Sequence, residues 1–173
     1  MVDYDSREKR PKPLRDITLR PMEAGDIPHV LEIERRSYPT PWSETAFRSE
    51  ITHNTSADYV VATHCEKVIG YAGMWLFLFE AHVTNIAVHP DYRGRKVGAQ
   101  LLLGLMGRAL LRGLKRMTLE VRVSNALAQD FYESYGFQFV KLKKGYYTDT
   151  GEDALVMLCR DIGEVLEKKG WDG

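Results

Sequence analysis

The spacing of hydrophobic and polar positions changes several times along the chain, and each spacing predicts a kind of element. Short apolar or alternating runs predict strands at 17–22, 59–65, 68–79, 82–88, 117–123, 137–143 and 153–159. Apolar residues three and four positions apart predict helices from 26 to the prolines at 39 and 41, from 43 onward, at 97–112, at 126–135 and, shorter, after 162. Because strands and helices do not alternate regularly, we predict a mixed α/β sheet rather than a doubly wound one.

Local signals refine two of these elements. The strands at 59–65 and 68–79 follow each other closely, which predicts a hairpin around Glu66 and Lys67. Trp42 precedes the helix that begins at Ser43, and Phe47 falls at its fourth position. This spacing is that of a hydrophobic staple, in which the two side chains pack against each other.

The length of the chain fits one domain. With 173 residues it can bury one ordinary hydrophobic core, but not two large ones. We predict a flexible polar tail at 1–16, a domain at 17–161 and a C-terminal extension at 162–173. Apolar residues make up 44% of the chain and charged residues 28%, which is typical of a globular protein.

Charge and composition argue against several kinds of partner. The formal net charge is +0, so the chain has no basic field that would attract nucleic acid. The longest apolar run, 68–79, is too short to span a membrane, and the first residues are too polar for a signal peptide. We expect a cytoplasmic protein with Cys65 and Cys159 as reduced core thiols. The histidines lack zinc-site spacing, so no metal is expected.

A basic, glycine-containing segment lies between the strand at 82–88 and the helix at 97–112. Residues 86–102 read IAVHPDYRGRKVGAQLL. Free backbone N–H groups at a helix N-terminus bind anions, and Gly94 and Gly98 would let a bulky anion approach them. Arg93, Arg95 and Lys96 add positive charge, so a pyrophosphate is the natural ligand. The alternative is an exposed basic turn whose glycines serve only to make it tight.

Two other phosphate-binding motifs are excluded. A P-loop requires G-x-x-x-x-G-K-[ST], and the residue after Gly98 is Ala99. A dinucleotide fingerprint requires G-x-G-x-x-G after the first strand of a Rossmann unit, and neither the motif nor that order of elements is present.

The segment resembles the phosphate loop of the GNAT acetyltransferases, whose pattern is [RQ]-x-x-G-x-[GA]. Here it reads Arg93-Gly94-Arg95-Lys96-Val97-Gly98, with Lys96 in the place of the first family glycine. The stretches NIAVHPDYRG, LEVRVSNALAQDFYESYGF and GYYTDTGEDALVM further resemble the ribosomal-protein-alanine N-acetyltransferase branch, and the likeness extends from about Thr18 to Arg160. It implies the GNAT fold, a mixed and mostly antiparallel sheet of about seven strands, flanked by helices, with strands 4 and 5 splayed apart.

The resemblance implies transfer of an acetyl group from acetyl-CoA to the α-amine of a protein N-terminus, without a metal. The implied acceptor is a small-subunit ribosomal protein that begins with alanine. The Val88 amide would polarise the thioester carbonyl. The residues that the family match assigns to the coenzyme are Ile86, Ala87, Val88, Arg93, Gly94, Arg95, Lys96, Val97, Gly98, Ala99, Asn125 and Tyr132.

Two residues carry the implied chemistry. Glu120 lies in the apolar strand MTLEVRV and corresponds to the family's general base, which acts through water. The alternative is a surface glutamate paired with Arg122 or with a neighbouring strand. Tyr132 matches the family's general acid, which protonates the departing coenzyme sulfur, although it could equally be a core aromatic. Asn125 matches the asparagine that binds the coenzyme arm and could also be a plain N-cap.

Acceptor binding is implied for the loop between the first two helices and for the loop before the last strand. Tyr38 and Trp42 lie in the first loop, and the staple already explains Trp42. Tyr146 and Tyr147 lie in the second, where adjacent tyrosines among Gly, Asp and Thr are not needed for a core.

Two other functions remain open at this point. The acceptor could be a lysine side chain, a polyamine or a small-molecule amine, because acceptor loops diverge quickly within a fold. The protein could also bind the coenzyme without turnover, as a sensor, which Lys96 favours and the pair Glu120 and Tyr132 disfavours. We expect a monomer or a weak dimer.

Overall fold

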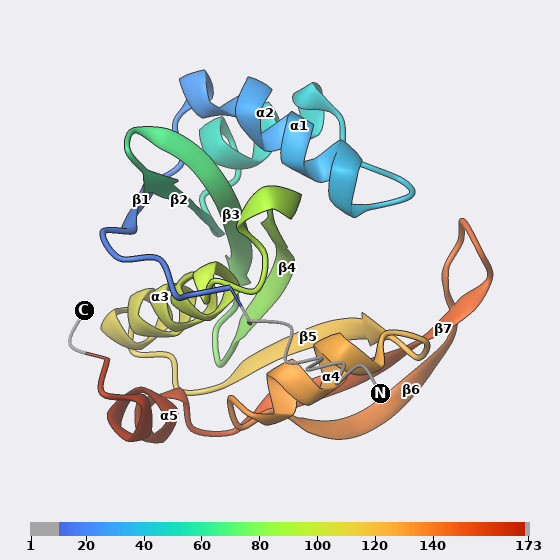
Figure 1. Ribbon diagram of the computed structural model, residues 1–173. Helices are drawn as coiled ribbons and strands as arrows, with labels where there is room; N and C mark the ends of the chain where they lie inside the picture. The colour runs from blue at the N-terminus through green and yellow to red at the C-terminus, as the bar shows by residue number, and fades with distance from the viewer. Residues whose placement is uncertain (1–10, 172–173) are drawn as a thin grey trace, which may run out of the picture.

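The computed structural model describes residues 11–171 and shows a seven-stranded sheet with helices on both faces (Figure 1). Two single 3₁₀ turns lie at Ala24–Asp26 and Pro90–Tyr92. The strands are β1 (Thr18–Pro21), β2 (Ala57–His64), β3 (Lys67–Leu76), β4 (Ala81–Val88), β5 (Met117–Arg122), β6 (Gln138–Tyr147) and β7 (Glu152–Cys159). The helices are α1 (Ile27–Ser37), α2 (Glu44–Thr52), α3 (Val97–Leu111), α4 (Ala126–Glu133) and α5 (Ile162–Lys169). The order of elements predicted from the sequence is confirmed.

The sheet opens in its middle. Its strand order is β1-β2-β3-β4-β5-β7-β6, and every neighbouring pair is antiparallel except β4 and β5. These two parallel strands pair only at Ala81 with Met117 and at His82 with Thr118, and then diverge (Figure 1). The mixed, mostly antiparallel sheet with splayed fourth and fifth strands is therefore confirmed. The divergence leaves the rest of β4 without a partner on the side of β5.

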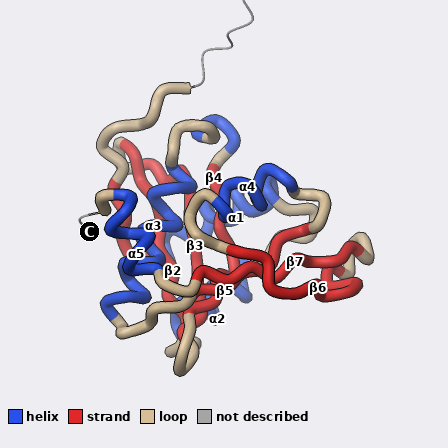
Figure 2. Tube along the Cα trace, turned by 90° about the horizontal axis from the view of Figure 1, so that it is seen from below, coloured by secondary structure: helices blue, strands red, loops and turns tan. Residues whose placement is uncertain are grey.

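Helices cover the two faces unequally. Helices α1 and α2 pack on one face over β2, β3 and β4, while α3 packs on the other face with α5 beside it (Figure 2). In β5 the residues Met117, Leu119 and Val121 face the core under α3 and α4, so Thr118 and Glu120 point to the opposite face. On that opposite face, side chains of β4, β5, β6 and β7 line an open groove.

The core follows the predicted periodicities. Val97, Leu101, Leu105 and Ala109 form the buried stripe of α3, as their spacing of four predicts. On the other face, Tyr59 lies flat across β3, and a Cβ on Gly73 would come within 2.1 Å of its ring. Only glycine fits at that position, because a side chain there would displace the tyrosine.

Two predicted boundaries around β3 were wrong. The β2–β3 hairpin turns at Cys65 and Glu66, which both adopt positive φ, and Cys65 is exposed rather than a core thiol. Strand β3 ends at Leu76 instead of continuing to 79. The Phe77 N–H donates to the Glu80 carbonyl at 2.9 Å, which closes a tight turn whose apolar side chains lie in solvent. An apolar run alone does not distinguish strand from exposed turn.

The ends of the chain contact the domain wherever they are described. Residues 1–10 of the predicted tail lie outside the described part. Leu14 packs against the core, and its N–H donates to the Arg95 carbonyl at 3.2 Å. Helix α5 buries Ile162 and Leu166 in the same core as α3. Within residues 11–171, the structure contains no helix long and apolar enough to cross a membrane.

Candidate active site

The main chain of β4 is available where β5 has diverged. Ile86 and Val88 pair with β3, but their carbonyls accept hydrogen bonds from side chains instead, from the Tyr38 hydroxyl at 2.8 Å and from Arg93 Nε at 3.0 Å. In an antiparallel ladder the N–H and C=O of one residue point to the same side. The N–H groups of Ile86 and Val88 therefore also point away from β3, toward the gap between β4 and β5.

The loop before α3 has the backbone geometry of an anion site. Gly94 and Lys96 adopt left-handed conformations, with φ of 72° and 65°, on either side of Arg95. The first N–H groups of α3, from Val97 onward, have no intrahelical partner, as in any helix. The Lys96 side chain at the N-cap does not accept from them either. Such a turn, next to a helix N-terminus, suits a phosphate or pyrophosphate.

Lys96 adopts a left-handed backbone conformation, which a residue with a side chain does not favour. Left-handed backbone costs an L-residue other than glycine about 1–2 kcal/mol, which explains why the resembled family has glycine there. Lys96 therefore adopts a conformation that glycine would adopt at a lower energetic cost.

Arg93 is turned toward the protein. Its guanidinium lies between Val88 and Ser37, donating to the Ser37 hydroxyl at 3.1 Å, and so links the end of α1 to the end of β4. The N-terminal segment lies against the same loop, since a Cβ on Gly94 would come within 3.3 Å of Pro11. Coenzyme contacts by Arg93 and its neighbours remain a prediction.

Glu120 is a nearly buried carboxylate with two partners from distant parts of the chain. Its side chain is 8% exposed, Oε1 accepts from Lys143 Nζ at 2.5 Å, and Oε2 lies 2.9 Å from His82 Nε2. The other ring nitrogen of His82 lies 3.0 Å from the Thr118 hydroxyl. Burial alone would raise the pKa of Glu120, but the hydrogen bonds from His82 and Lys143 outweigh it and hold the pKa below its ordinary value. The carboxylate is therefore ionised at neutral pH.

Glu120 opens onto a groove on the uncovered face of the sheet. The groove has a volume of about 630 Å³, and its lining includes His82, Lys143 and Tyr146 around the carboxylate and Trp75 further away. Of the two pairings considered from the sequence, the one with Arg122 is wrong, because Arg122 pairs with Asp149 and Glu152. The one with a neighbouring strand is confirmed by His82, which lies on β4 next to β5. A buried carboxylate facing an open groove is suited to proton transfer.

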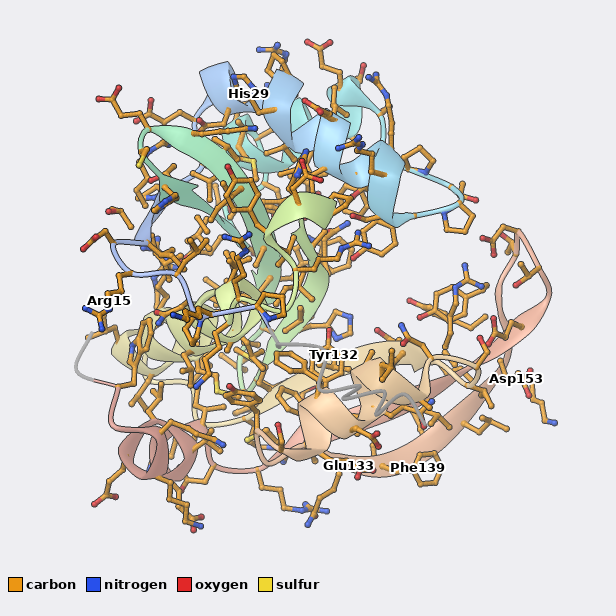
Figure 3. The ribbon with its side chains drawn as sticks, in the orientation of Figure 1. Arg15, His29, Tyr132, Glu133, Phe139 and Asp153 are labelled. Carbon is orange, nitrogen blue, oxygen red and sulfur yellow. The ribbon has the colours of Figure 1, made fainter. Side chains whose placement is uncertain are left out.

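Tyr132 lies on the other face of the sheet from Glu120, in the core with Leu119 and Val121. It points from α4 toward the middle of the molecule, whereas Glu133 is on the outer side of the helix (Figure 3). Its ring packs against Phe131 and Phe137, with centroid distances of 5.2 Å and 5.7 Å. Burial raises the pKa of Tyr132, and the neighbouring hydroxyls of Tyr38 and Tyr147 raise it further. The phenol therefore keeps its proton at neutral pH.

Asn125 is the N-cap of α4, which confirms one of the two interpretations made from the sequence. Its side-chain oxygen accepts from the Ala128 N–H at 3.1 Å. This bond uses the amide oxygen and leaves the amide N–H groups available to donate, so capping and coenzyme binding are compatible.

The loop between α1 and α2 is held by a second buried carboxylate. Trp42 packs on Phe47 at a centroid distance of 5.5 Å, which confirms the predicted staple. The backbone N–H of Trp42 donates to one oxygen of the Glu34 carboxyl at 2.9 Å, and the Tyr71 hydroxyl donates to the other oxygen. Burial raises the pKa of Glu34 to about 7, although the Trp42 N–H counteracts this. Tyr38, at the end of α1, is thereby fixed over β4.

Tyr146 and Tyr147 are the last residues of β6 and not a loop, which corrects the prediction. An irregular register after Lys143 lets β6 continue to Tyr147, and the Gly145 N–H donates to Asp153 at 2.8 Å. The two rings meet edge to face at 5.1 Å, and Tyr146 is 43% exposed in the groove. Burial raises the pKa of Tyr147 to about 12.

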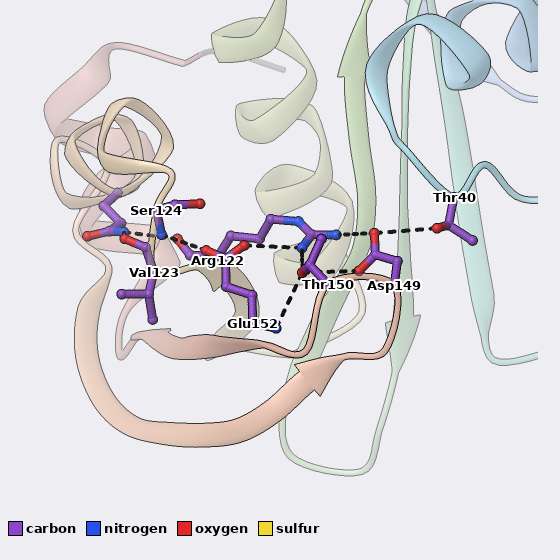
Figure 4. Close-up of polar contacts among 8 residues, drawn as sticks. Thr40, Arg122, Val123, Ser124, Asp149, Thr150 and Glu152 are labelled. Atoms are coloured by element: carbon purple, nitrogen blue, oxygen red, sulfur yellow. Dashed lines mark hydrogen bonds and ion pairs between the residues drawn. The ribbon is translucent and has the colours of Figure 1, made fainter.

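Arg122 organises the turn between β6 and β7 (Figure 4). Its guanidinium donates to Asp149 at 2.7 Å and to Glu152 at 3.2 Å, and lies 3.9 Å from the centroid of the Tyr147 ring. The Thr40 hydroxyl donates to Asp149 at 3.4 Å, so the turn reaches the α1–α2 loop (Figure 4). The two loops expected to bind the acceptor are thus joined across the gap.

Comparison with known proteins adds the family. Residues 27–137 match the model of the Acetyltransferase (GNAT) family, which is more than half of the chain. The chain belongs to the GNAT acetyltransferase family. Within it, the protein is 41% identical over 139 residues to the putative ribosomal protein bS18-alanine N-acetyltransferase of Bacillus subtilis, covering 80% of this chain and 92% of the relative. It is 38% identical over 144 residues to the Escherichia coli ribosomal protein bS18-alanine N-acetyltransferase, covering 81% and 95%.

Solved structures agree with the sequence relatives. The crystal structure of the Escherichia coli ribosomal-protein-S18-alanine N-acetyltransferase superposes on this GNAT protein with a TM-score of 0.75 at 37% identity, covering 82% of this chain and 92% of the other. A GNAT acetyltransferase from Elizabethkingia anophelis with acetyl-CoA bound, 20% identical, has a TM-score of 0.72 and covers 85% and 99%. The resemblance noted from the sequence, to the family and to this branch, is confirmed.

Sequence reasoning missed several residues that shape the site of this GNAT protein. His82 and Lys143 hold Glu120, and Glu34 holds the α1–α2 loop. Glu34 carried a signal, because it follows Val30 and Leu31 on the apolar stripe of α1, where a charge calls for an explanation. His82 and Lys143 carried none that is visible in one sequence. Within residues 11–171, no group of three or more His, Cys, Asp or Glu side chains is placed to hold a metal.

Proposed function

We propose that this GNAT protein transfers the acetyl group of acetyl-CoA to the N-terminal α-amine of a protein, with a ribosomal protein that begins with alanine as its target. Relatives with 41% and 38% identity along most of their length are named for that reaction. One observation carries the mechanism: Glu120, ionised and nearly buried, faces the open groove beside the gap between β4 and β5.

The gap and the loop before α3 fit the coenzyme. The free N–H groups of Ile86 and Val88 would bond the pantetheine arm, and the backbone from Gly94 to Ala99 would hold the pyrophosphate at the helix N-terminus. Acetyl-CoA supplies a thioester, whose carbonyl carbon is attacked and whose thiolate leaves. The Val88 N–H is the group best oriented to stabilise negative charge on the thioester oxygen.

Glu120 accepts a proton from the acceptor nitrogen through a water molecule. As the C–N bond forms and the C–S bond breaks, the nitrogen becomes positively charged and its proton strongly acidic, so a carboxylate with a low pKa can still take it. Tyr132 supplies the proton that the departing sulfur takes up, because burial keeps its hydroxyl protonated at neutral pH. The acceptor peptide would enter between Tyr38 and the pair Tyr146 and Tyr147.

A peptide panel tests the proposal. The protein is incubated with acetyl-CoA and short peptides that begin with Ala, Ser or Met, with a terminally blocked peptide that carries one lysine, and with spermidine, and free thiol is measured. Release with the open peptides is expected. Release only with the lysine peptide or spermidine would establish a different acceptor, and coenzyme binding without any release would favour a sensor.

Tyr132→Phe tests the acid. We expect turnover of the open peptide to fall by about tenfold or more, within the range for a lost general acid, while coenzyme binding by calorimetry changes little. Tyr135→Phe, just beyond the end of the same helix and partly exposed, is the matched control. Unchanged turnover of Tyr132→Phe under conditions where chemistry limits the rate would remove this residue from the mechanism.

A further inference from the structure

Both oxygens of Glu120 are already occupied by the protein's own side chains. Lys143 reaches across from β6 to Oε1, and His82 reaches from β4 to Oε2. Tyr146 and Tyr147 also face the carboxylate from β6, and the Lys143 ammonium lies 4.9 Å from the centroid of the Tyr146 ring. The negative charge of Glu120 is therefore paired within the protein and does not face the groove as a free charge.

Lys143 and Glu120 differ in how much of each side chain is exposed. The Glu120 side chain is 8% exposed and the Lys143 side chain 38% exposed, and both line the groove, so Lys143 is the more accessible member of the pair. An acceptor nitrogen that approaches Glu120 through the groove first meets a positive charge. Like charges at close range repel each other, and a lysine side chain is charged when it arrives.

We propose that Lys143 determines which amines the site accepts, by covering Glu120 with a fixed positive charge so that only amines arriving uncharged react well. This inference rests on the proposed acetyl transfer. It makes Lys143 a specificity-determining residue, which leaves the proton-accepting role to Glu120.

The discrimination follows from ordinary amine chemistry. An N-terminal α-amine has a pKa of about 7.7–8.0 and a lysine side chain about 10.4, so at pH 7.5 roughly a third of the first and about one in a thousand of the second are uncharged. While Lys143 covers Glu120, the two amines differ in reactivity by the full ratio of their uncharged fractions. An uncovered Glu120 would bind the charged lysine as an ion pair and take its first proton. The second proton, released as the C–N bond forms, would then pass through water and Tyr132 to the departing sulfur. In this way part of the difference between the two amines is lost.

Lys143→Met tests this, because methionine has a similar length and no charge. The assay measures kcat/KM at pH 7.5 for a peptide with an open alanine terminus and no lysine, and for a terminally blocked peptide with one lysine. For the wild type we expect a strong preference for the open peptide. For Lys143→Met we expect the ratio to shift toward the lysine peptide by about tenfold or more, mainly through a lower KM for that peptide.

Two controls separate charge from packing. Lys143→Arg keeps a positive charge at the end of the side chain and is expected to keep the wild-type ratio. Lys144→Met removes the neighbouring lysine, which is 84% exposed and pairs with Asp153, and is expected to change neither rate. Circular dichroism and thermal melting verify that each variant is folded.

The pH dependence provides a readout that a merely structural role would not change. For the wild type, the rate on the lysine peptide is expected to rise steeply between pH 7.5 and 9.5, as the uncharged fraction of lysine rises. In Lys143→Met the rise is expected to be shallower, because Glu120 takes the first proton.

The outcomes are distinct. Equal losses for both peptides in Lys143→Met, with unchanged pH profiles, would overturn the inference and leave the proposed function in place. Absence of wild-type turnover on the open peptide would overturn the proposed function and this inference with it.

Discussion

Glu34 and Glu120 are two buried carboxyl groups in the same protein whose pKa values are shifted in opposite directions. Glu34 is 1% exposed below the α1–α2 loop, where an N–H and a hydroxyl donate to it, from Trp42 and Tyr71. The Glu120 side chain is 8% exposed on the open face of the sheet, where Lys143 and His82 hold it. The pKa of Glu34 is raised to about 7, and the pKa of Glu120 is lowered.

The difference shows that the charge of the partners decides the ionisation state, since both groups are largely shielded from water. Neutral donors compensate only part of the cost of burying a negative charge, whereas an ammonium compensates it directly. Glu34 is suited to fixing a loop, and Glu120 to receiving a proton at neutral pH. Three experiments test this contrast.

Glu120→Gln is expected to have the largest effect. Turnover of the open alanine peptide at pH 7.5 should fall by about 100-fold or more, because glutamine cannot accept the proton from the acceptor nitrogen. Thiol release measures turnover, and calorimetry should show coenzyme affinity within a few-fold of the wild type. Equal activity of the variant across pH would show that Glu120 does not act as the base.

Glu34→Gln is expected to change how stability depends on pH. The folded-state pKa of Glu34 is about 7, above its unfolded value of 4.5, so the folded state binds more protons between these pH values. Its contribution to the free energy of unfolding therefore falls as pH rises from about 4.5 to about 7, by about 3 kcal/mol in total. Relative to the wild type, Glu34→Gln should gain that amount between pH 5 and pH 8.

Urea unfolding of both proteins at each pH measures this difference. Glu120 titrates in both proteins, and its depressed pKa gives stability that is lost as pH falls, so its contribution cancels in the subtraction. Glu44→Gln, at the exposed start of α2, is the matched control. A difference that stays flat with pH would mean that Glu34 is ionised when folded.

His82→Phe is expected to have the smallest effect. Phenylalanine keeps a ring beside Trp75 but removes the hydrogen bond to Glu120, so the pKa of Glu120 should rise, with Lys143 still in place. Carbon NMR titration of labelled glutamate carboxyls measures this, with Glu120→Gln to assign the signal. His53→Phe, at the exposed end of α2, is the control. An unchanged pKa would mean that Lys143 alone holds the charge.

The order of elements and the anion loop could be predicted because they depend on residues close together in the sequence. The spacing in α3, the staple of Trp42 and Phe47, and the cap by Asn125 are all local. The prediction that Tyr146 and Tyr147 lie in a loop was wrong because their placement depends on residues from other parts of the chain. Gly145 suggested a loop, but the N–H bond to Asp153 and the Arg122 guanidinium over Tyr147 extend the strand.

The sequence by itself determined that an acidic residue would lie in the apolar strand β5 and that a basic, glycine-containing turn would precede α3. Only the tertiary structure decided what that residue does, because its partners come from β4 and β6, which are far from it along the chain. The charge state of a buried carboxyl depends on groups within a few ångströms of its oxygens, and folding alone determines which groups those are.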